Sequence, residues 1–170
     1  MRDYGYRQTM HSFEPLPDAL AQLEKEAADD PDWHVHSFAL GKADERRRFH
    51  IGMNDQTSSL KPAVKDMRHH IDAMVVAKEI DVDVRRLDDV AAGLGVDLAR
   101  SFMKLDVQGA ELDVIEGLGS RMVEVPLIQM ETAIVPAYQE ETRLTTMLDW
   151  FAEGGWHVIG IRPGFFEPRT

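Results

Sequence analysis

Hydrophobic and polar positions alternate in the middle of the chain. Ile80, Val82 and Val84 are separated by charged residues, and this period of two predicts a half-buried β-strand. Other short apolar runs, bounded by Pro, Gly or polar residues, predict the remaining strands. The predicted strands are residues 8–13, 33–40, 49–53, 80–84, 101–107, 127–131 and 156–161.

Between these runs, apolar residues three or four positions apart predict helices. Leu20, Leu23 and Ala27 share one face of a helix that opens at Asp18. Similar stripes predict a helix ending at Gly95, one ending at Gly119, and one capped by Thr142 and ending at Gly154. Strands separated by single helices predict an α/β fold with a mostly parallel sheet and helices on both faces. Ligands bind such sheets at the carboxyl ends of the strands.

Composition narrows the class of protein. The chain has 170 residues, 44% of them hydrophobic, a formal net charge of −11 and no cysteine. We expect one domain over residues 1–170. Disulfide scaffolds and Cys-based zinc or redox sites are excluded, and the acidic balance argues against a nucleic-acid binder. No apolar run has the length of a membrane helix, and the N-terminus does not resemble a secretory signal, so we expect a cytoplasmic protein.

Three predicted strands end on an acid, namely Glu14, Asp106 and Glu131. A carboxylate at such a position can accept both hydroxyls of a ribose. Each acid also has a simpler interpretation. Glu14 fits a turn residue before a proline-rich corner, Asp106 fits a helix cap, and Glu131 fits a solvated strand end.

Two strings carry a family resemblance: Ser12–Pro15 and, much later, Lys104–Glu111. Together with the segments between and after them, they resemble the FkbM-type methyltransferase family, and the matches cover nearly the whole chain. The Lys104–Glu111 string is the most specific of them. The other matching segments are Ala39–Gly41, Ser58–Leu60, Leu87–Asp88, Ile128–Glu131 with Tyr138, and Gly155–Trp156.

The resemblance implies a Rossmann-like enzyme that uses S-adenosylmethionine to methylate a hydroxyl group of a small metabolite, sugar or lipid. By position in the family pattern, Glu14 would bind the ribose hydroxyls of the cofactor. Leu40 and Gly41 would lie near its adenine, and Asp106 would lie beside the reacting methyl group. Glu111 would support the loop that carries Asp106.

Methylation of an alcohol needs a base, because the acceptor hydroxyl must lose its proton. Asp106 is the first candidate and Glu131 the second. His34 and His36 share one face of a predicted strand, and His69–His70 follow in an ambiguous segment. We interpret the histidines as partly exposed polar residues and expect no metal site from them, although Mg²⁺ held by Asp106 and other oxygen ligands stays open.

One family element has no counterpart before Glu14: a strand with a glycine-rich loop, which would lie between the strands ending at Glu14 and Asp106. We therefore expect a domain that is incomplete at its N-terminus relative to the family. The two flanking strands would pair directly, receive a strand from another chain or leave the sheet open. An open sheet centre would favour a homo-oligomer.

The missing loop leaves two further functions to consider. One is a non-catalytic Rossmann-like remnant or pseudoenzyme that acts as an interaction module. The other is a nucleotide-dependent oxidoreductase, ranked last because no phosphate-binding loop is present. Under the methyltransferase interpretation, substrate choice is expected in the loops at residues 54–75 and 132–143. The run Glu45–Arg48 is expected to be a solvated turn.

Overall fold

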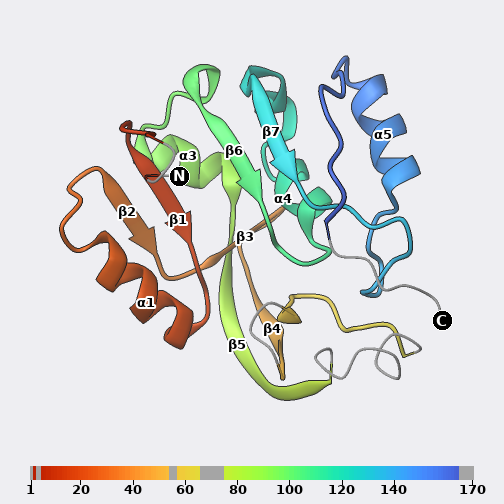
Figure 1. Ribbon diagram of the computed structural model, residues 1–170, viewed down its shortest axis with the longest axis horizontal. Helices are drawn as coiled ribbons and strands as arrows, with labels where there is room; N and C mark the ends of the chain where they lie inside the picture. The colour runs from red at the N-terminus through yellow and green to blue at the C-terminus, as the bar shows by residue number, and fades with distance from the viewer. Residues whose placement is uncertain (1, 3–4, 54–56, 66–74, 165–170) are drawn as a thin grey trace.

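The computed structural model describes residues 2, 5–53, 57–65 and 75–164, and it has a mixed α/β fold (Figure 1). The strands are β1 (Met10–Phe13), β2 (Trp33–His36), β3 (Ala39–Gly41), β4 (Glu45–Gly52), β5 (Val76–Arg86), β6 (Phe102–Leu105) and β7 (Leu127–Met130). The helices are α1 (Pro17–Ala27), α3 (Leu87–Leu94), α4 (Glu111–Glu116) and α5 (Leu144–Glu153), with 3₁₀ turns η4 (Leu98–Arg100) and η5 (Gly119–Glu124).

The described strands form three short sheets where the sequence predicted one. β1 pairs with β2 and β6 with β7, both in parallel, whereas β5 lies between a parallel β3 and an antiparallel β4. The predicted α/β alternation and the parallel pairs are confirmed. Within the described residues β1 and β6 do not pair with each other, so the sheet is open between the strands that precede Glu14 and Asp106.

The predicted strand over residues 33–40 is two strands. The chain bends at Ser37–Phe38, and Ala39–Gly41 then pairs with the end of β5 in a different sheet. The ring of Phe38 packs on Phe13 and His36, with ring centroids 5.6 and 5.7 Å away. This packing at the bend is a tertiary contact that the apolar pattern does not contain.

The run Glu45–Arg48 is the start of β4, so the predicted turn is wrong. Antiparallel pairing sets Arg46 opposite Asp83 and Arg48 opposite Asp81. The charged groups of these pairs lie 3.6 and 2.9 Å apart. Opposite charges directly across two strands stabilise the pairing, which the local sequence of the run does not reveal.

The predictions near the C-terminus are partly wrong. Residues 156–161 have the alternation of a strand but pair with no strand in the described part of the chain, and Val158 and Ile159 are exposed. A ladder partner is required for a strand, and the pattern alone does not supply one. Helix α5 is confirmed, but its N-cap is Arg143, without a side-chain cap bond, instead of Thr142.

Beside a small cluster of Ala63 and Tyr138, two large apolar clusters hold the described part of the chain together. The larger one joins α3, β6, α4 and η5 around Val114, Ile115 and Leu118, which are almost completely buried. The smaller one joins Leu16, before α1, to the inner face of β4 and β5. The larger cluster therefore supports the end of β6, where Asp106 follows.

Candidate functional site

Asp106 and Glu131 lie next to each other at the carboxyl ends of two paired strands. β6 and β7 are parallel, and Leu105 stands opposite Met130. The next residues, Asp106 and Glu131, therefore leave the sheet at the same edge. Both are exposed, and the Asp106 carboxylate lies 2.9 Å from Nζ of Lys104. The structure thus brings together the two sequence-predicted base candidates.

The side chain of Gln108 bridges these two carboxylates. Its Nε2 donates to Oδ1 of Asp106 at 3.1 Å and to Oε2 of Glu131 at 3.5 Å. The backbone of Gln108 has φ 50°, in the left-handed region that residues other than glycine rarely adopt. Gly109 follows with φ 92°. This turn after β6 sets the amide between the ends of both strands.

The buried side chain of Tyr138 lies behind Gln108. Its hydroxyl is 3.0 Å from Oε1 of Gln108 and 3.1 Å from the carbonyl oxygen of Thr57. Burial raises the pKa of Tyr138 above its usual value, and nearby carboxylates raise it further. The hydroxyl is therefore protonated at neutral pH and donates a hydrogen bond toward these two oxygens.

Two further side chains hold the backbone of this turn. Ser59 donates its hydroxyl to the carbonyl oxygen of Gln108 at 2.6 Å. Glu111 is buried, and its Oε1 accepts the backbone N–H groups of Val107 and Gly109, both at 3.3 Å. Burial raises the pKa of Glu111, and these N–H groups oppose that shift. Glu111 thus makes the loop-supporting contacts that the family resemblance implied.

Glu14 leaves β1 at the same end as Asp106 leaves β6, since β1, β2, β6 and β7 run in one direction (Figure 1). One oxygen of its half-buried carboxylate accepts the backbone N–H of Leu16 at 2.8 Å. This bond closes a local turn before α1. The contact agrees with the simpler interpretation of Glu14, and it leaves a role in cofactor binding as a prediction.

Leu40 and Gly41 take part in packing. Leu40 packs against the larger apolar cluster, and Gly41 is buried. A Cβ on Gly41 would meet the side chain of Val84 at 2.6 Å, and a Cβ on Gly117 would meet the carbonyl oxygen of Gly41. Gly41 therefore leaves room for Val84, and Gly117 allows the end of α4 to approach β3 closely. The predicted place of Leu40 and Gly41 near an adenine stays a prediction.

Two loops meet beside Asp106, Glu131 and Gln108, which we call the Asp106 group. We call the loops the first loop (residues 57–65) and the second loop (residues 133–143). Ala63 forms an isolated antiparallel bridge with Tyr138. Backbone hydrogen bonds of 2.9 and 2.8 Å flank this bridge. The two loops lie within the segments 54–75 and 132–143, in which the sequence placed substrate choice, and the structure brings them together.

Sequence reasoning missed Gln108 and Lys61. Lys61 is almost completely buried, with Nζ 3.1 Å from the carbonyl oxygen of Glu140 and 3.4 Å from the carboxylate of Asp113. It ties the first loop to the second loop and to α4. For Gln108 the available signal was a polar residue directly before Gly109 in the specific Lys104–Glu111 string; for Lys61 the sequence contains no such signal.

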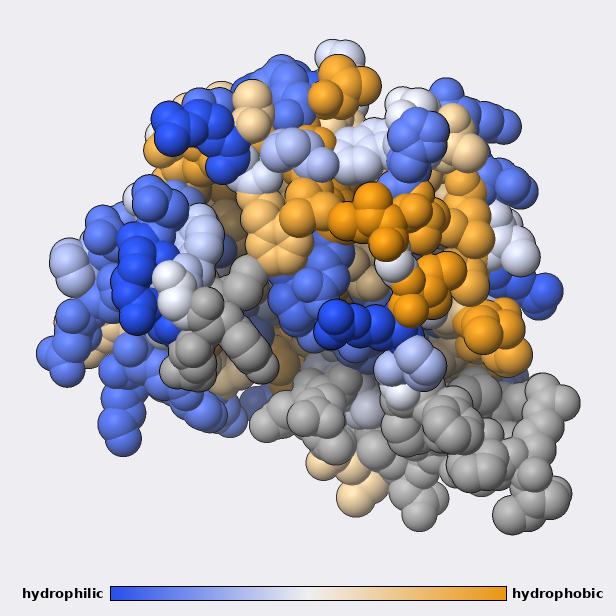
Figure 2. Space-filling model, turned by 45° about the horizontal axis from the view of Figure 1, so that its top comes forward, coloured by the Kyte–Doolittle hydropathy of each residue, from blue (hydrophilic) through white to orange (hydrophobic). Residues whose placement is uncertain are grey.

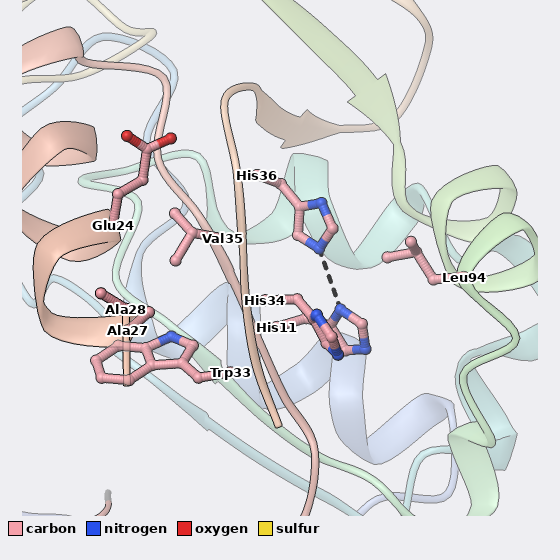
Figure 3. Close-up of a pocket in the computed structure, with 9 residues that line it drawn as sticks. All are labelled: His11, Glu24, Ala27, Ala28, Trp33, His34, Val35, His36 and Leu94. Atoms are coloured by element: carbon pink, nitrogen blue, oxygen red, sulfur yellow. Dashed lines mark hydrogen bonds between the residues drawn. The ribbon is translucent and has the colours of Figure 1, made fainter. Parts of the chain in front are cut away.

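Three histidines line a shallow, open cavity of about 560 Å³ on the β1–β2 pair (Figure 3). His34 and His36 share one strand face, as predicted, and His11 joins them from β1. Nδ1 of His11 lies 3.1 Å from Nε2 of His36. Figure 3 shows the three imidazoles on the side of Leu94, away from Glu24 and Val35. His69–His70 fall outside the described residues.

Over the described ranges, no three His, Cys, Asp or Glu side chains are placed to hold a metal ion. No described helix is long and apolar enough to cross a membrane.

Apolar side chains gather on the face shown in Figure 2, over the region where Figure 1 places β7, α5 and the segment after α5. Ile134 and Val135 of the second loop are 79% and 56% exposed. The segment after α5 adds Ile159 and Ile161, also exposed. The second loop therefore presents apolar surface as well as its contacts to Gln108.

Comparison with known proteins gives a family match. Residues 1–163 match the family model described as the methyltransferase FkbM domain. The 2-O-methyltransferase NoeI of Sinorhizobium fredii (strain NBRC 101917 / NGR234) is 26% identical over 143 residues, which cover 81% of this chain. The matched part is 58% of NoeI, so the chain spans less than two thirds of this curated relative. No solved structure matches the chain.

Proposed function

The chain belongs to the FkbM methyltransferase family, and on this premise we propose that it transfers a methyl group from S-adenosylmethionine to a hydroxyl of a small metabolite, sugar or lipid. Its fold would be the Rossmann-like fold of class I methyltransferases. The observation that carries the proposal is the pair Asp106 and Glu131, held together by Gln108 at the ends of two parallel strands. The name of the relative, a 2-O-methyltransferase, supports oxygen as the methylated atom.

The strand-end carboxylates fit the chemistry of the cofactor. A sulfonium is a cation, and the exposed carboxylate of Asp106 supplies a negative charge at the edge of the sheet. Glu14 leaves its strand at the same end, and a carboxylate there suits two ribose hydroxyls. Leu40 already packs against the larger apolar cluster, and Gly41 lies against Val84. Both would therefore contact the adenine only through their backbone or their partly buried surface.

The residues of this chain would position the acceptor and take its proton. When bound, S-adenosylmethionine supplies an activated methyl group and a neutral thioether leaving group. Asp106 would accept the proton of the acceptor hydroxyl, with Glu131 as the second candidate base. Much of the rate would come from holding the hydroxyl oxygen in line with the methyl carbon.

The two loops would form the binding surface for the acceptor. The first loop contacts Gln108 through Ser59, and the second loop contacts it through Tyr138. The exposed Ile134 and Val135 offer apolar contacts to a sugar ring or a lipid chain. The several carboxylates nearby would disfavour an anionic acceptor.

Titration calorimetry with S-adenosylmethionine tests the proposal. We expect binding to the wild-type protein, and we expect Asp106→Asn to weaken it by about tenfold, because a charge-assisted contact is lost. Asp149→Asn, at an exposed aspartate of α5, is the matched control and should bind like wild type. No heat and no thermal shift with the wild-type protein would favour the alternative, a non-catalytic module.

A further inference from the structure

We propose that Gln108 is a positioning residue, whose side-chain amide orients the carboxylates of Asp106 and Glu131 and connects them to the two loops. The proposal deepens the methyltransferase function and rests on it. It concerns a residue that touches the two candidate bases and is not itself a base.

The contacts of the amide allow only one orientation. Nε2 faces Asp106 and Glu131, and Oε1 faces the hydroxyl of Tyr138. Rotation of the amide by half a turn would set Oε1 against two carboxylates, which offer no proton when ionised. The NH₂ group has two protons, one for each carboxylate. Gln108 therefore draws both candidate bases toward one point.

The backbone of Gln108 has a conformation that is unusual for this residue type. Gln108 has φ 50°, a conformation in which glycine or asparagine costs less. The Ser59 hydroxyl bond to its carbonyl oxygen, at 2.6 Å, and the buried Glu111 on the neighbouring N–H groups hold the turn in place. A conformation that is unfavourable for glutamine, and that several contacts maintain, indicates that the amide itself is needed there.

The same amide joins the bases to the loops. The Tyr138 hydroxyl is shared between Oε1 of Gln108 and the carbonyl oxygen of Thr57. Tyr138 belongs to the second loop and Thr57 to the first loop. Tyr138 of the second loop is thus two hydrogen bonds away from Asp106, and Thr57 of the first loop is three away. Binding of an acceptor to either loop is therefore coupled to the orientation of the carboxylates.

The first test uses the side-chain NMR signals of Gln108 in ¹⁵N-labelled protein, assigned by their loss in Gln108→Met. We expect Asp106→Asn to shift the Nε2 proton signals of Gln108, because it replaces a charged acceptor at 3.1 Å by a neutral group. Glu131→Gln should shift them less, because its contact is longer, at 3.5 Å. Gln139→Met, at an exposed glutamine of the second loop, is the control and should leave the Gln108 signals unchanged. Signals that stay at their wild-type positions in both carboxylate variants overturn the proposal.

The second test measures S-adenosylmethionine binding to two variants with opposite backbone effects. Gln108→Met keeps the strained turn, whereas Gln108→Gly relieves it, and both remove the amide. We expect each variant to raise the Kd for S-adenosylmethionine about 3- to 10-fold. In the double variant with Asp106→Asn, Gln108→Met should raise the Kd by less than about twofold over Asp106→Asn alone. Thermal unfolding confirms that each variant is folded.

The outcomes separate the two proposals. A folded Gln108→Met variant that binds like wild type overturns the positioning role and leaves the methyltransferase function intact. A wild-type protein that gives no heat overturns the methyltransferase function for this chain. In that case the NMR comparison of the variants alone decides whether Gln108 holds the two carboxylates.

Discussion

At the scale of single residues, the turn after β6 depends on one buried carboxylate. Glu111 is 4% exposed and accepts two backbone N–H groups of that turn. A buried donor without a partner costs free energy, because it has lost its hydrogen bonds to water. The position of Asp106 therefore rests on Glu111 as well as on the strand.

Replacement of Glu111 by alanine should lower the free energy of unfolding by about 1–3 kcal/mol, because both N–H groups lose their acceptor. Glu116→Ala, at an exposed position on the same helix, is the matched control and should change it by less than about 0.5 kcal/mol. Chemical denaturation measures both values. Equal effects of the two substitutions would contradict this role of Glu111.

The histidine cluster is the second residue-scale feature with a measurable consequence. Burial lowers the pKa of His11 and of His36 below 6.5, and the neighbouring imidazoles lower both further. The folded protein therefore binds protons on these rings less readily than the unfolded chain. The stability that comes from keeping these rings neutral is fully present at a pH above the pKa of histidine in the unfolded chain. It is lost as the pH falls through the lowered pKa values of the folded protein.

We therefore expect the free energy of unfolding to fall between about pH 7 and about pH 5.5, and His11→Phe to reduce that slope. Phenylalanine keeps a ring in the stack but takes up no proton. His157→Phe, at an exposed position after α5, should leave the slope unchanged. Urea denaturation at a series of pH values measures the slopes, and a steeper slope in His11→Phe would refute the assignment.

At the scale of elements, α4 and β3 approach each other through two glycines. A Cβ on Gly117, at the end of α4, would meet the backbone carbonyl of Gly41 in β3. Backbone cannot move aside as a flexible side chain does. The small residue is therefore required by the contact between the two elements, and the φ of −61° at Gly117 requires no glycine.

Gly117→Ala should lower the free energy of unfolding by about 1–3 kcal/mol, through overpacking against β3. Gly93→Ala is the matched control, since nothing lies within 4 Å of a Cβ there and the residue is inside α3. Alanine in a helix interior should be neutral or stabilising by up to about 1 kcal/mol. A Gly117→Ala variant as stable as wild type would show that α4 and β3 are not in close contact.

At the scale of the whole molecule, the buried core is unevenly distributed. The larger apolar cluster lies around α3, β6 and α4, and the smaller one on β4 and β5. In contrast, β1 and β2 contain no buried residue. The strand pair that precedes Glu14 thus has little apolar support, whereas the strand that precedes Asp106 packs into the larger cluster through Leu105 and Met103.

Native-state hydrogen exchange should reveal this difference. We expect the amides of β1 and β2 to exchange at least about tenfold faster than those of β6 and the buried half of β5, because local opening exposes little apolar surface there. Amide exchange followed by NMR at a fixed pH makes the comparison. Equal protection of β1 and β6 would mean that the whole molecule opens as one unit.

The amino-acid sequence by itself determined the local elements and the strand-end acids. The period of two at Ile80, Val82 and Val84 and the helical stripe before Gly95 depend only on neighbouring residues, and both predictions are confirmed. Asp106 and Glu131 were found because each directly follows a short apolar run. The family was also recognisable, from the specific string Lys104–Glu111 together with Ser12–Pro15 and the segments between and after them.

Only the tertiary structure decided how these pieces meet. The β4 strand at Glu45–Arg48 depends on charges of β5 more than thirty residues away. Residues 156–161 pair with none of the described strands despite their pattern. The link from Tyr138 through Gln108 to the two carboxylates joins segments far apart in the chain. Hydrogen bonds and packing of this kind depend on distances in space, which a periodic pattern along one chain does not encode.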